Sequence, residues 1–180
     1  MNQLVKFGLI LGVICLAATL VLAVTYEVTK PKIAAQLKME EQSALKNIMP
    51  GADSFVEKKM GEIEYFEALS GNVPVGYCVR VTGNGYSGYI RIMAGVDMDG
   101  TIQGVAVLEH SETPGLGARI NEIKQGESEP WFLKKFKGKN ARNIAVKKDI
   151  DAITGATISS KAVTDAIRKT IDELFTKLKR

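Results

Sequence analysis

The chain begins with an uninterrupted apolar stretch. No charged residue occurs from Phe7 to Tyr26, where Leu, Ile, Val and Ala dominate. A helix of about 20 residues rises roughly 30 Å, the thickness of a bilayer's hydrocarbon core. A cleaved signal peptide is the alternative, but its apolar core usually spans only about 7–15 residues before a small-x-small cleavage site. The pattern therefore favours a retained transmembrane anchor over residues 1–30.

A helical pattern continues beyond this anchor. Between Lys and Glu residues, apolar side chains recur at roughly helical spacing, at Ile33, Leu37, Ala44, Leu45 and Ile48. Met49-Pro50-Gly51 predicts the end of that helix. We therefore expect a connecting helix and linker over residues 31–60 and one domain over residues 61–180.

The pattern then changes to short runs rich in Ile, Val and Tyr, which are typical of strands. These runs are Ile63–Leu69, Val75–Thr82, Tyr89–Met98 and Thr101–Leu108. Asp99-Gly100, between the last two, is a strong signal for a tight hairpin. The domain is therefore predicted to contain an antiparallel sheet.

The remainder of the chain predicts a loop and two helices. A loop rich in Pro and Gly spans residues 109–123, and a brief helix with inward-facing aromatics follows over residues 130–136. An amphipathic helix starts at about Ser160, and its apolar face comprises Val163, Ile167, Ile171, Leu174 and Leu178. The predicted fold class is α+β, with one N-terminal transmembrane helix, one antiparallel sheet and flanking helices.

Composition excludes several functions. The net charge of +4 and the pI near 9.0 suggest a nucleic-acid binder, but the excess gathers around Lys134–Lys148 and at the C-terminus without interleaved aromatics, which is typical of a solvated surface. Cys15 lies in the anchor and Cys78 in a predicted strand, so we expect no disulfide between them. Without a Cys-x-x-Cys motif and with His110 as the only histidine, no metal site is predicted.

Residues 83–88 match the Gly-x-Gly-x-x-Gly fingerprint of dinucleotide-binding folds. That fingerprint works only where a strand leads into it and a helix starts from it. Here the following residues, 89–93, are β-rich. A glycine-rich connection between two strands is therefore the favoured interpretation.

The segment from Asp151 to Ser160 carries four Thr or Ser residues interrupted by Gly and Ala, just ahead of the last helix. An ordinary N-cap would explain one of these hydroxyls. Small residues at a helix start also allow a phosphate to approach the free backbone amides. Both interpretations, a helix cap and a phosphate site, remain open on the residues alone.

Asp151-x-x-Thr154-Gly155-Ala156-Thr157 resembles the flavinylation motif Asp-x-x-(Ser/Thr)-Gly-Ala-(Ser/Thr) of FMN-binding domains. The loop from Glu112 to Gly117 resembles the second hallmark of that family, and residues 131–138 also follow its pattern. With the N-terminal anchor, the chain resembles the G subunits of the Rnf ferredoxin:NAD oxidoreductases. The C subunits of sodium-pumping NADH:quinone reductases are similar relatives.

The resemblance implies a cofactor and its site. FMN would be joined through a phosphoester to Thr157, one per chain, by a flavin transferase that uses FAD and magnesium. Thr154, Gly155 and Ala156 would shape the pocket for the FMN phosphate, and Asp151 would belong to the signal that the transferase recognises. The residues expected against the isoalloxazine ring are Glu112, Thr113, Leu116 and Gly117.

The resemblance also implies a function. The chain would be an electron-transfer subunit of a membrane complex that translocates Na+ or H+, with no complete activity of its own and no catalytic residue beyond the flavin. Its partners would be iron–sulfur and flavin subunits, and its domain would lie on the extracytoplasmic side. The charges flanking the anchor give almost no bias of their own. Which ion is moved, the flavin potential, and the roles of Asp151 and His110 stay open.

Two rival hypotheses remain. An independent covalent-FMN reductase would bring its own substrate domain or a second cofactor motif. A flavin-free scaffold would only anchor a membrane assembly, and in it Thr157 would serve as a helix cap and carry no added mass.

Overall fold

The computed structural model describes residues 3–179 and separates into two compact units, residues 1–40 and 41–180. The first unit consists of most of helix α1, Gln3–Ile48. This helix is long and apolar enough to cross a membrane. It continues through Pro31 and ends directly before Met49-Pro50-Gly51, as the sequence predicts.

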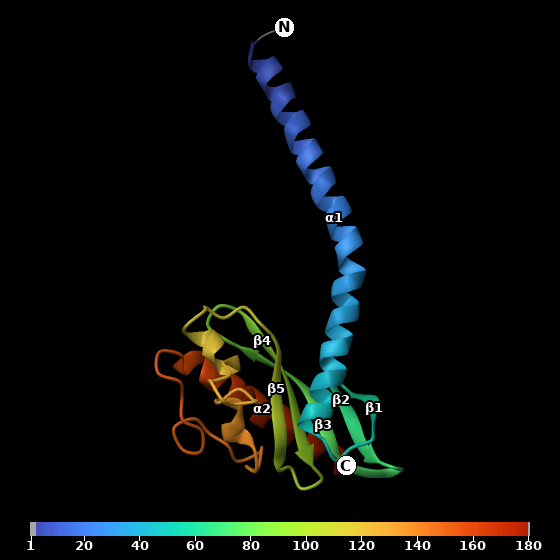
Figure 1. The fold of residues 1–180 in the computed structure, drawn as a ribbon, viewed down its shortest axis with the longest axis vertical. Helices are drawn as coiled ribbons and strands as arrows, with labels where there is room; N and C mark the ends of the chain where they lie inside the picture. Colours follow the sequence, from blue (N-terminus) through green and yellow to red (C-terminus); the bar gives the residue numbers. More distant parts are fainter. Residues whose placement is uncertain (1–2, 180) are drawn as a thin grey trace. The chain divides into compact units, whose positions relative to one another are not determined.

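The second unit is built on one antiparallel sheet with the strand order β1-β2-β3-β4-β5 (Figure 1). Its strands are β1 (Ser54–Met60), β2 (Ile63–Ser70), β3 (Val73–Asn84), β4 (Tyr89–Asp97) and β5 (Ile102–His110). The four predicted strands are confirmed to within two residues. The turn between β4 and β5 is also confirmed: Gly100 has a φ of 86°, and Asp97 N donates to Thr101 O at 3.0 Å.

Strand β1 lies in the segment for which the sequence predicted only a connecting helix and linker. It forms an edge of the sheet and most of its side chains are exposed, so it lacks a buried apolar face. Its pairing with β2 includes two charged contacts, Lys58 with Glu67 and Lys59 with Glu64. Charged edge strands of this kind give little hydrophobic signal in a sequence.

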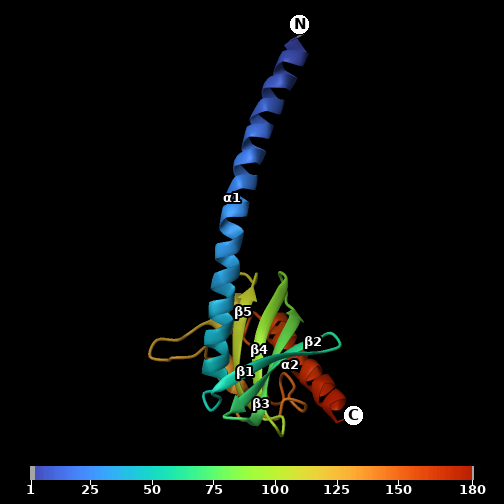
Figure 2. The ribbon, with the colours of Figure 1, turned by 90° about the vertical axis from the view of Figure 1, so that its right-hand side faces the viewer.

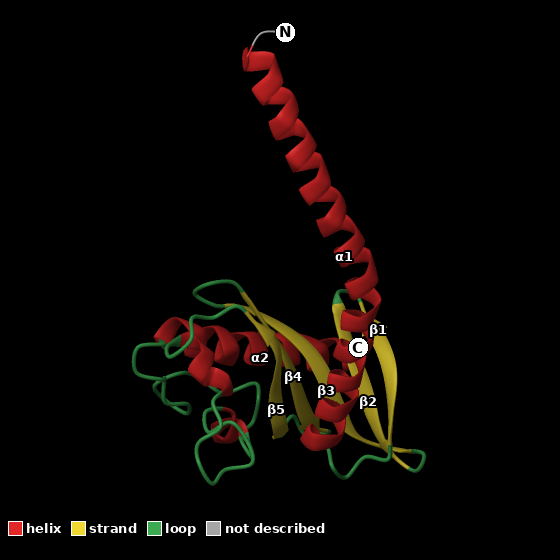
Figure 3. Ribbon diagram, turned by 45° about the horizontal axis from the view of Figure 1, so that its top comes forward, coloured by secondary structure: helices red, strands yellow, loops and turns green. Residues whose placement is uncertain are grey.

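The two faces of the sheet carry different cores, because successive side chains of a strand point to opposite sides. Helix α2, Thr157–Leu178, covers the face with the larger core (Figures 1 and 2). On the other face Met93 packs with Leu45, Ile48 and Met49, so the last turns of α1 lie on the opposite side of the sheet from α2 (Figure 3). The sheet is thus held between two helices.

Helix α2 buries the apolar face expected from the sequence, with Leu178 only partly buried, but it starts at Thr157 and not at Ser160. Two 3-10 helices complete the larger core: η1, Gly117–Asn121, and η2, Leu133–Phe136. The latter lies in the predicted brief helix; Phe136 at its end and Phe132 directly before it are fully buried. Together α2, η1 and η2 cover the face of the sheet that carries the larger core.

Arg80 of β3 joins the last turns of α1 to the sheet. Its guanidinium contacts Glu41 through two hydrogen bonds of 2.6 and 3.0 Å, and it also reaches Glu57 at 2.7 Å and Glu64 at 3.0 Å. The hydrogen bonds to Glu41 and Glu57 raise the pKa of Arg80 above its ordinary value. The guanidinium also lies over the Phe66 ring, 4.7 Å from its centre. One cation therefore holds three carboxylates from α1, β1 and β2.

The contact between α1 and the sheet predicts the effect of filling a glycine. Gly95 pairs with Gly104 across β4 and β5, and a methyl group on Gly95 would clash with the Ile48 side chain. We expect Gly95→Ala to lower the free energy of unfolding by about 1–3 kcal/mol through overpacking. Gly51→Ala is the matched control, because a methyl group there meets no atom within 4 Å. Thermal unfolding of the full chain in detergent measures both, and equal stability of the two variants would contradict the packing described.

Candidate functional site

Two hallmark segments, the flavinylation motif (residues 151–157) and the loop of residues 112–117, meet at one cavity of about 390 Å3. Three parts of the chain line it: the turn between β3 and β4, the loop after β5, and the start of α2. The lining residues are Tyr86, Glu112, Thr113, Leu116, Gly117, Gly155, Ala156, Thr157, Ile158 and Ser159. Seven of the eight residues singled out from the sequence are therefore together at this cavity. Thr154 is not among the lining residues and lies exposed in the adjacent turn.

The loop before α2 has a fixed local geometry. Gly155 has a φ of 80°, a conformation that favours glycine, and a side chain there would touch Leu116 of the other hallmark segment. The buried Ser160 hydroxyl accepts a hydrogen bond from Ile153 N at 3.0 Å and donates one to Ala156 O at 2.9 Å. Ser160 thus ties the loop to the first turn of the helix.

The start of α2 does not follow the pattern of an ordinary cap. Ala156 occupies the N-cap position, and no side chain there accepts a hydrogen bond from the helix. Thr157 is the first helical residue and is exposed. The first amides of a helix have no partner within the helix, so an uncapped start suits an anion such as a phosphate. The interpretation of Thr157 as the cap is therefore wrong for this structure.

Glu112 lines the cavity and is buried, with only 5% of the residue exposed. Its Oε1 accepts a hydrogen bond from Ser87 N at 3.0 Å, and its Oε2 accepts one from the Ser159 hydroxyl. Its own backbone N donates to His110 Nδ1 at 3.3 Å. One side chain therefore connects all three segments that line the cavity.

Gly117 is explained by that carboxylate. A methyl group on Gly117 would clash with Glu112 Oε2 and would lie 2.7 Å from Ser159 Oγ. The second hallmark segment thus needs a glycine here to make room for the Glu112–Ser159 hydrogen bond.

Three cavity residues, Tyr86, Ile158 and Ser159, were not predicted as site residues. The structure confirms a connection between two strands: residues 83 and 84 end β3, and residues 85–88 lead to β4 without starting a helix. The turn nevertheless reaches the cavity through Tyr86. No sequence signal indicates this role, because the glycine motif by itself predicts only a connection between strands. For Ser159 a signal existed, because the run from Thr154 to Ser160 holds more hydroxyls than one helix cap can use.

Other residues of interest lie outside the cavity lining. Asp151 is exposed and contacts Lys135 at 3.4 Å. The Trp131 indole donates to Glu122 at 3.1 Å, and this bond together with Arg119 lowers the pKa of that carboxyl group. Within residues 3–179, no group of three or more His, Cys, Asp and Glu side chains is placed to hold a metal ion.

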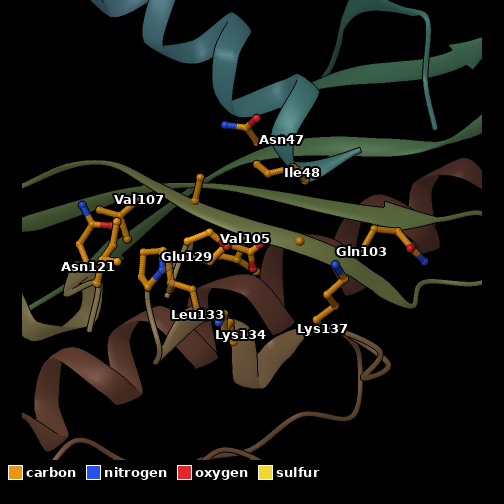
Figure 4. A pocket seen from close by; sticks show the side chains of 15 residues that line it. Asn47, Ile48, Gln103, Val105, Val107, Asn121, Glu129, Leu133, Lys134 and Lys137 are labelled. Carbon is orange, nitrogen blue, oxygen red and sulfur yellow. The ribbon is translucent and has the colours of Figure 1, made fainter. Parts of the chain in front are cut away.

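A second cavity of about 240 Å3 lies between the end of α1, strand β5 and residues 128–137 (Figure 4). Asn47 and Ile48 line it from one side, and Lys134 and Lys137 from the other. It shares no residue with either hallmark segment, so the first cavity is the candidate site.

Comparison with known families matches two regions of the chain. The FMN-binding domain family matches residues 85–172, which include every residue lining the first cavity. The RnfG N-terminal region matches residues 1–48, a range that ends at the last residue of α1.

Whole-chain relatives agree with both matches. The G subunit of the proton-translocating ferredoxin:NAD(+) oxidoreductase complex of Clostridium ljungdahlii is 33% identical, over 92% of this chain and 89% of its own length. The G subunit of the ion-translocating oxidoreductase complex is 34% identical in Methanosarcina acetivorans, over 95% and 94%, and 33% identical in Escherichia coli K12, over 91% and 87%.

Among solved structures, the C subunit of the Na(+)-translocating NADH-quinone reductase of Parabacteroides distasonis is similar. Its TM-score is 0.51 at 28% identity, over 66% of this chain and 63% of that one. With two matched regions and relatives above 30% identity along nearly the whole chain, this protein belongs to the G-subunit family of the Rnf ion-translocating oxidoreductase complexes.

Proposed function

We propose that the chain carries one FMN, joined through a phosphoester to Thr157, and transfers electrons within a membrane-bound, ion-translocating ferredoxin:NAD oxidoreductase complex. One observation carries the proposal: the flavinylation motif and the second hallmark segment line a single cavity inside the region that matches the FMN-binding domain family.

The residues present suit this cofactor. The volume of about 390 Å3 lies in the usual range for small-molecule sites. Leu116, Ile158 and Tyr86 offer apolar and aromatic surface for a flat ring system, and the uncapped start of α2 offers amides for a phosphate. Bound FMN would supply one- and two-electron chemistry, while the protein would hold and orient it.

The attachment itself needs an accessible hydroxyl, and Thr157 is exposed at the cavity. A flavin transferase would form the bond between Thr157 Oγ1 and the FMN phosphorus of FAD. The pyrophosphate bond of FAD would break, AMP would leave, and the hydroxyl proton would pass to a base of the transferase. Thr154, Gly155 and Ala156 would shape the phosphate pocket, and Asp151, which is exposed, would be available for recognition.

Helix α1 would be a single-pass anchor, with the domain on the extracytoplasmic side of the cell membrane. In that setting the partners would be membrane, iron–sulfur and flavin subunits of the same complex. The Clostridium ljungdahlii relative is named for proton translocation, and either H+ or Na+ is compatible with the electron-transfer role proposed here. The ion path would lie in other subunits.

The attachment site predicts a clear loss on substitution. In cells that contain the flavin transferase, Thr157→Ala should lose all covalent flavin, whereas Thr157→Ser should keep it because a hydroxyl remains. Thr176→Ala, an exposed threonine of the same helix, is the matched control and should keep it as well. Stability should change by less than about 1 kcal/mol, because Thr157 does not cap the helix. The measurements are intact mass and ultraviolet-excited gel fluorescence after denaturation.

Two results would contradict the proposal. Covalent flavin on Thr157→Ala would place the attachment elsewhere. An unmodified wild-type chain, isolated from cells with an active transferase, would favour the flavin-free scaffold.

A further inference from the structure

The glycine-rich motif of residues 83–88, which ends β3 and forms the turn to β4, is the one sequence motif that the flavinylation site leaves unexplained. Its glycines meet different neighbours. A methyl group on Gly83 would lie 2.8 Å from Ala162 O of α2, so this glycine lets the strand approach the helix. A methyl group on Gly85 would clash with the Glu112 carboxylate. The spacing that resembles a nucleotide fingerprint therefore serves two close contacts around the cavity.

The turn is fixed at its tip. Gly85 N donates to Gly88 O at 2.8 Å, which closes the turn, and Ser87 N donates to Glu112 Oε1 at 3.0 Å. The hydroxyls of Ser87 and Thr113 also lie 3.3 Å apart. Two contacts thus attach the turn to the second hallmark segment.

Glu112 has both carboxylate oxygens engaged within the protein, one by Ser87 N and one by the Ser159 hydroxyl. A buried carboxylate that lost either donor would carry an uncompensated desolvation cost. Glu112 therefore acts on the site by holding the turn and the start of α2 in place.

Tyr86 stands at the tip of this turn, directly before Ser87. It lines the cavity and yet 74% of it is exposed. Tyr89, three residues later, is exposed to a similar extent, 69%, but is not among the lining residues. Leu116 and Ile158 line the same cavity. Together with the Tyr86 ring, these two aliphatic side chains form a surface on which a flat aromatic ring can stack.

We propose that the turn between β3 and β4 is the third wall of the flavin site: Tyr86 contacts the isoalloxazine ring, and Glu112 is a positioning residue that holds Tyr86 there through Ser87. This inference rests on the proposed covalent FMN. It differs from the expectation that Glu112 itself lies against the ring.

A tyrosine in contact with a flavin leaves a spectroscopic signature. The photoexcited flavin takes one electron from the phenol ring, and the electron then returns to the tyrosine, so both are restored and no light is emitted. Tryptophan can donate in the same way, whereas phenylalanine and alanine cannot. Fluorescence of the folded, loaded protein therefore reports the contact independently of electron-transfer activity.

The experiment uses the full chain, loaded with FMN in cells that contain the transferase and kept in detergent. Mass spectrometry first establishes FMN on the Thr157 peptide of each variant. We expect Tyr86→Ala and Tyr86→Phe to be several-fold brighter per flavin than the wild type, and Tyr86→Trp to stay as dark. Tyr89→Ala is the matched control and should not change. All variants should have equal brightness after denaturation.

The positioning role of Glu112 has a test of its own. Glu112→Ala should brighten the flavin as Tyr86→Ala does, because the turn is released, whereas Glu109→Ala on the exposed end of β5 should not. Thermal unfolding identifies variants that remain folded. If Glu112→Ala does not fold, Ser159→Ala replaces it and should produce a smaller increase, since the carboxylate keeps the Ser87 contact.

The outcomes separate the two proposals. No FMN mass on any variant or on the wild type would refute the proposed function. Loaded protein whose brightness is unchanged by Tyr86→Ala, or raised equally by Tyr89→Ala, would overturn the contact with Tyr86 and leave the covalent FMN in place. An unchanged brightness in folded, loaded Glu112→Ala and Ser159→Ala would overturn the positioning role.

Discussion

The cavity depends on one buried carboxylate. Glu112 is hydrogen-bonded to Ser87, 25 positions earlier in the chain, and to Ser159, 47 positions later. A carboxylate cannot be buried at low cost unless its oxygens are satisfied. The three segments must therefore come together for the domain to fold with Glu112 inside. The geometry of the site is in this sense a condition of folding.

The surroundings of the carboxylate restrict the sequence further. Gly85 and Gly117 lie where any side chain would clash with it, and Gly155 has a backbone conformation that favours glycine next to Leu116. These glycines lie in three different segments, and each lies against an atom of the cavity lining. By comparison, the Arg80 cluster at the other face of the sheet is partly exposed. Each of its ion pairs therefore contributes less to stability than a buried contact does, and the cluster mainly joins the last turns of α1 to the strands.

Much of the fold could be predicted from the sequence because its signals are local. The runs rich in Ile, Val and Tyr in β2 to β5, the Asp99-Gly100 turn and the apolar face of α2 are each visible within a short stretch of the sequence. Strand β1 could not be predicted, because an exposed, charged edge strand has no buried face that would require a run of Ile, Val and Tyr. The start of α2 was placed too late, because Thr157 and Ile158 are exposed and do not continue its apolar stripe.

The candidate site could be predicted only in part, for the same physical reason. Seven residues were found through the two motifs, but Tyr86 and Ser159 are at the cavity because of contacts between segments far apart in the chain. Such contacts have no periodic signature. Residues 83–88 do not form a nucleotide fold, and their glycines instead allow close contacts with α2 and Glu112. A motif that fails its usual context test can still mark a close approach of the backbone to something else.

The openness of the cavity gives a physical reason for the proposed covalent attachment. Leu116, Ile158 and Tyr86 line it and are each more than half exposed, so a flavin there would be only partly enclosed. Tight binding of small ligands without a covalent bond usually requires burial of most of their surface. An exposed ring edge is nevertheless what a partner's cofactor must approach for electrons to pass. A phosphoester on Thr157 would resolve this conflict, since it holds the cofactor permanently while leaving the ring accessible.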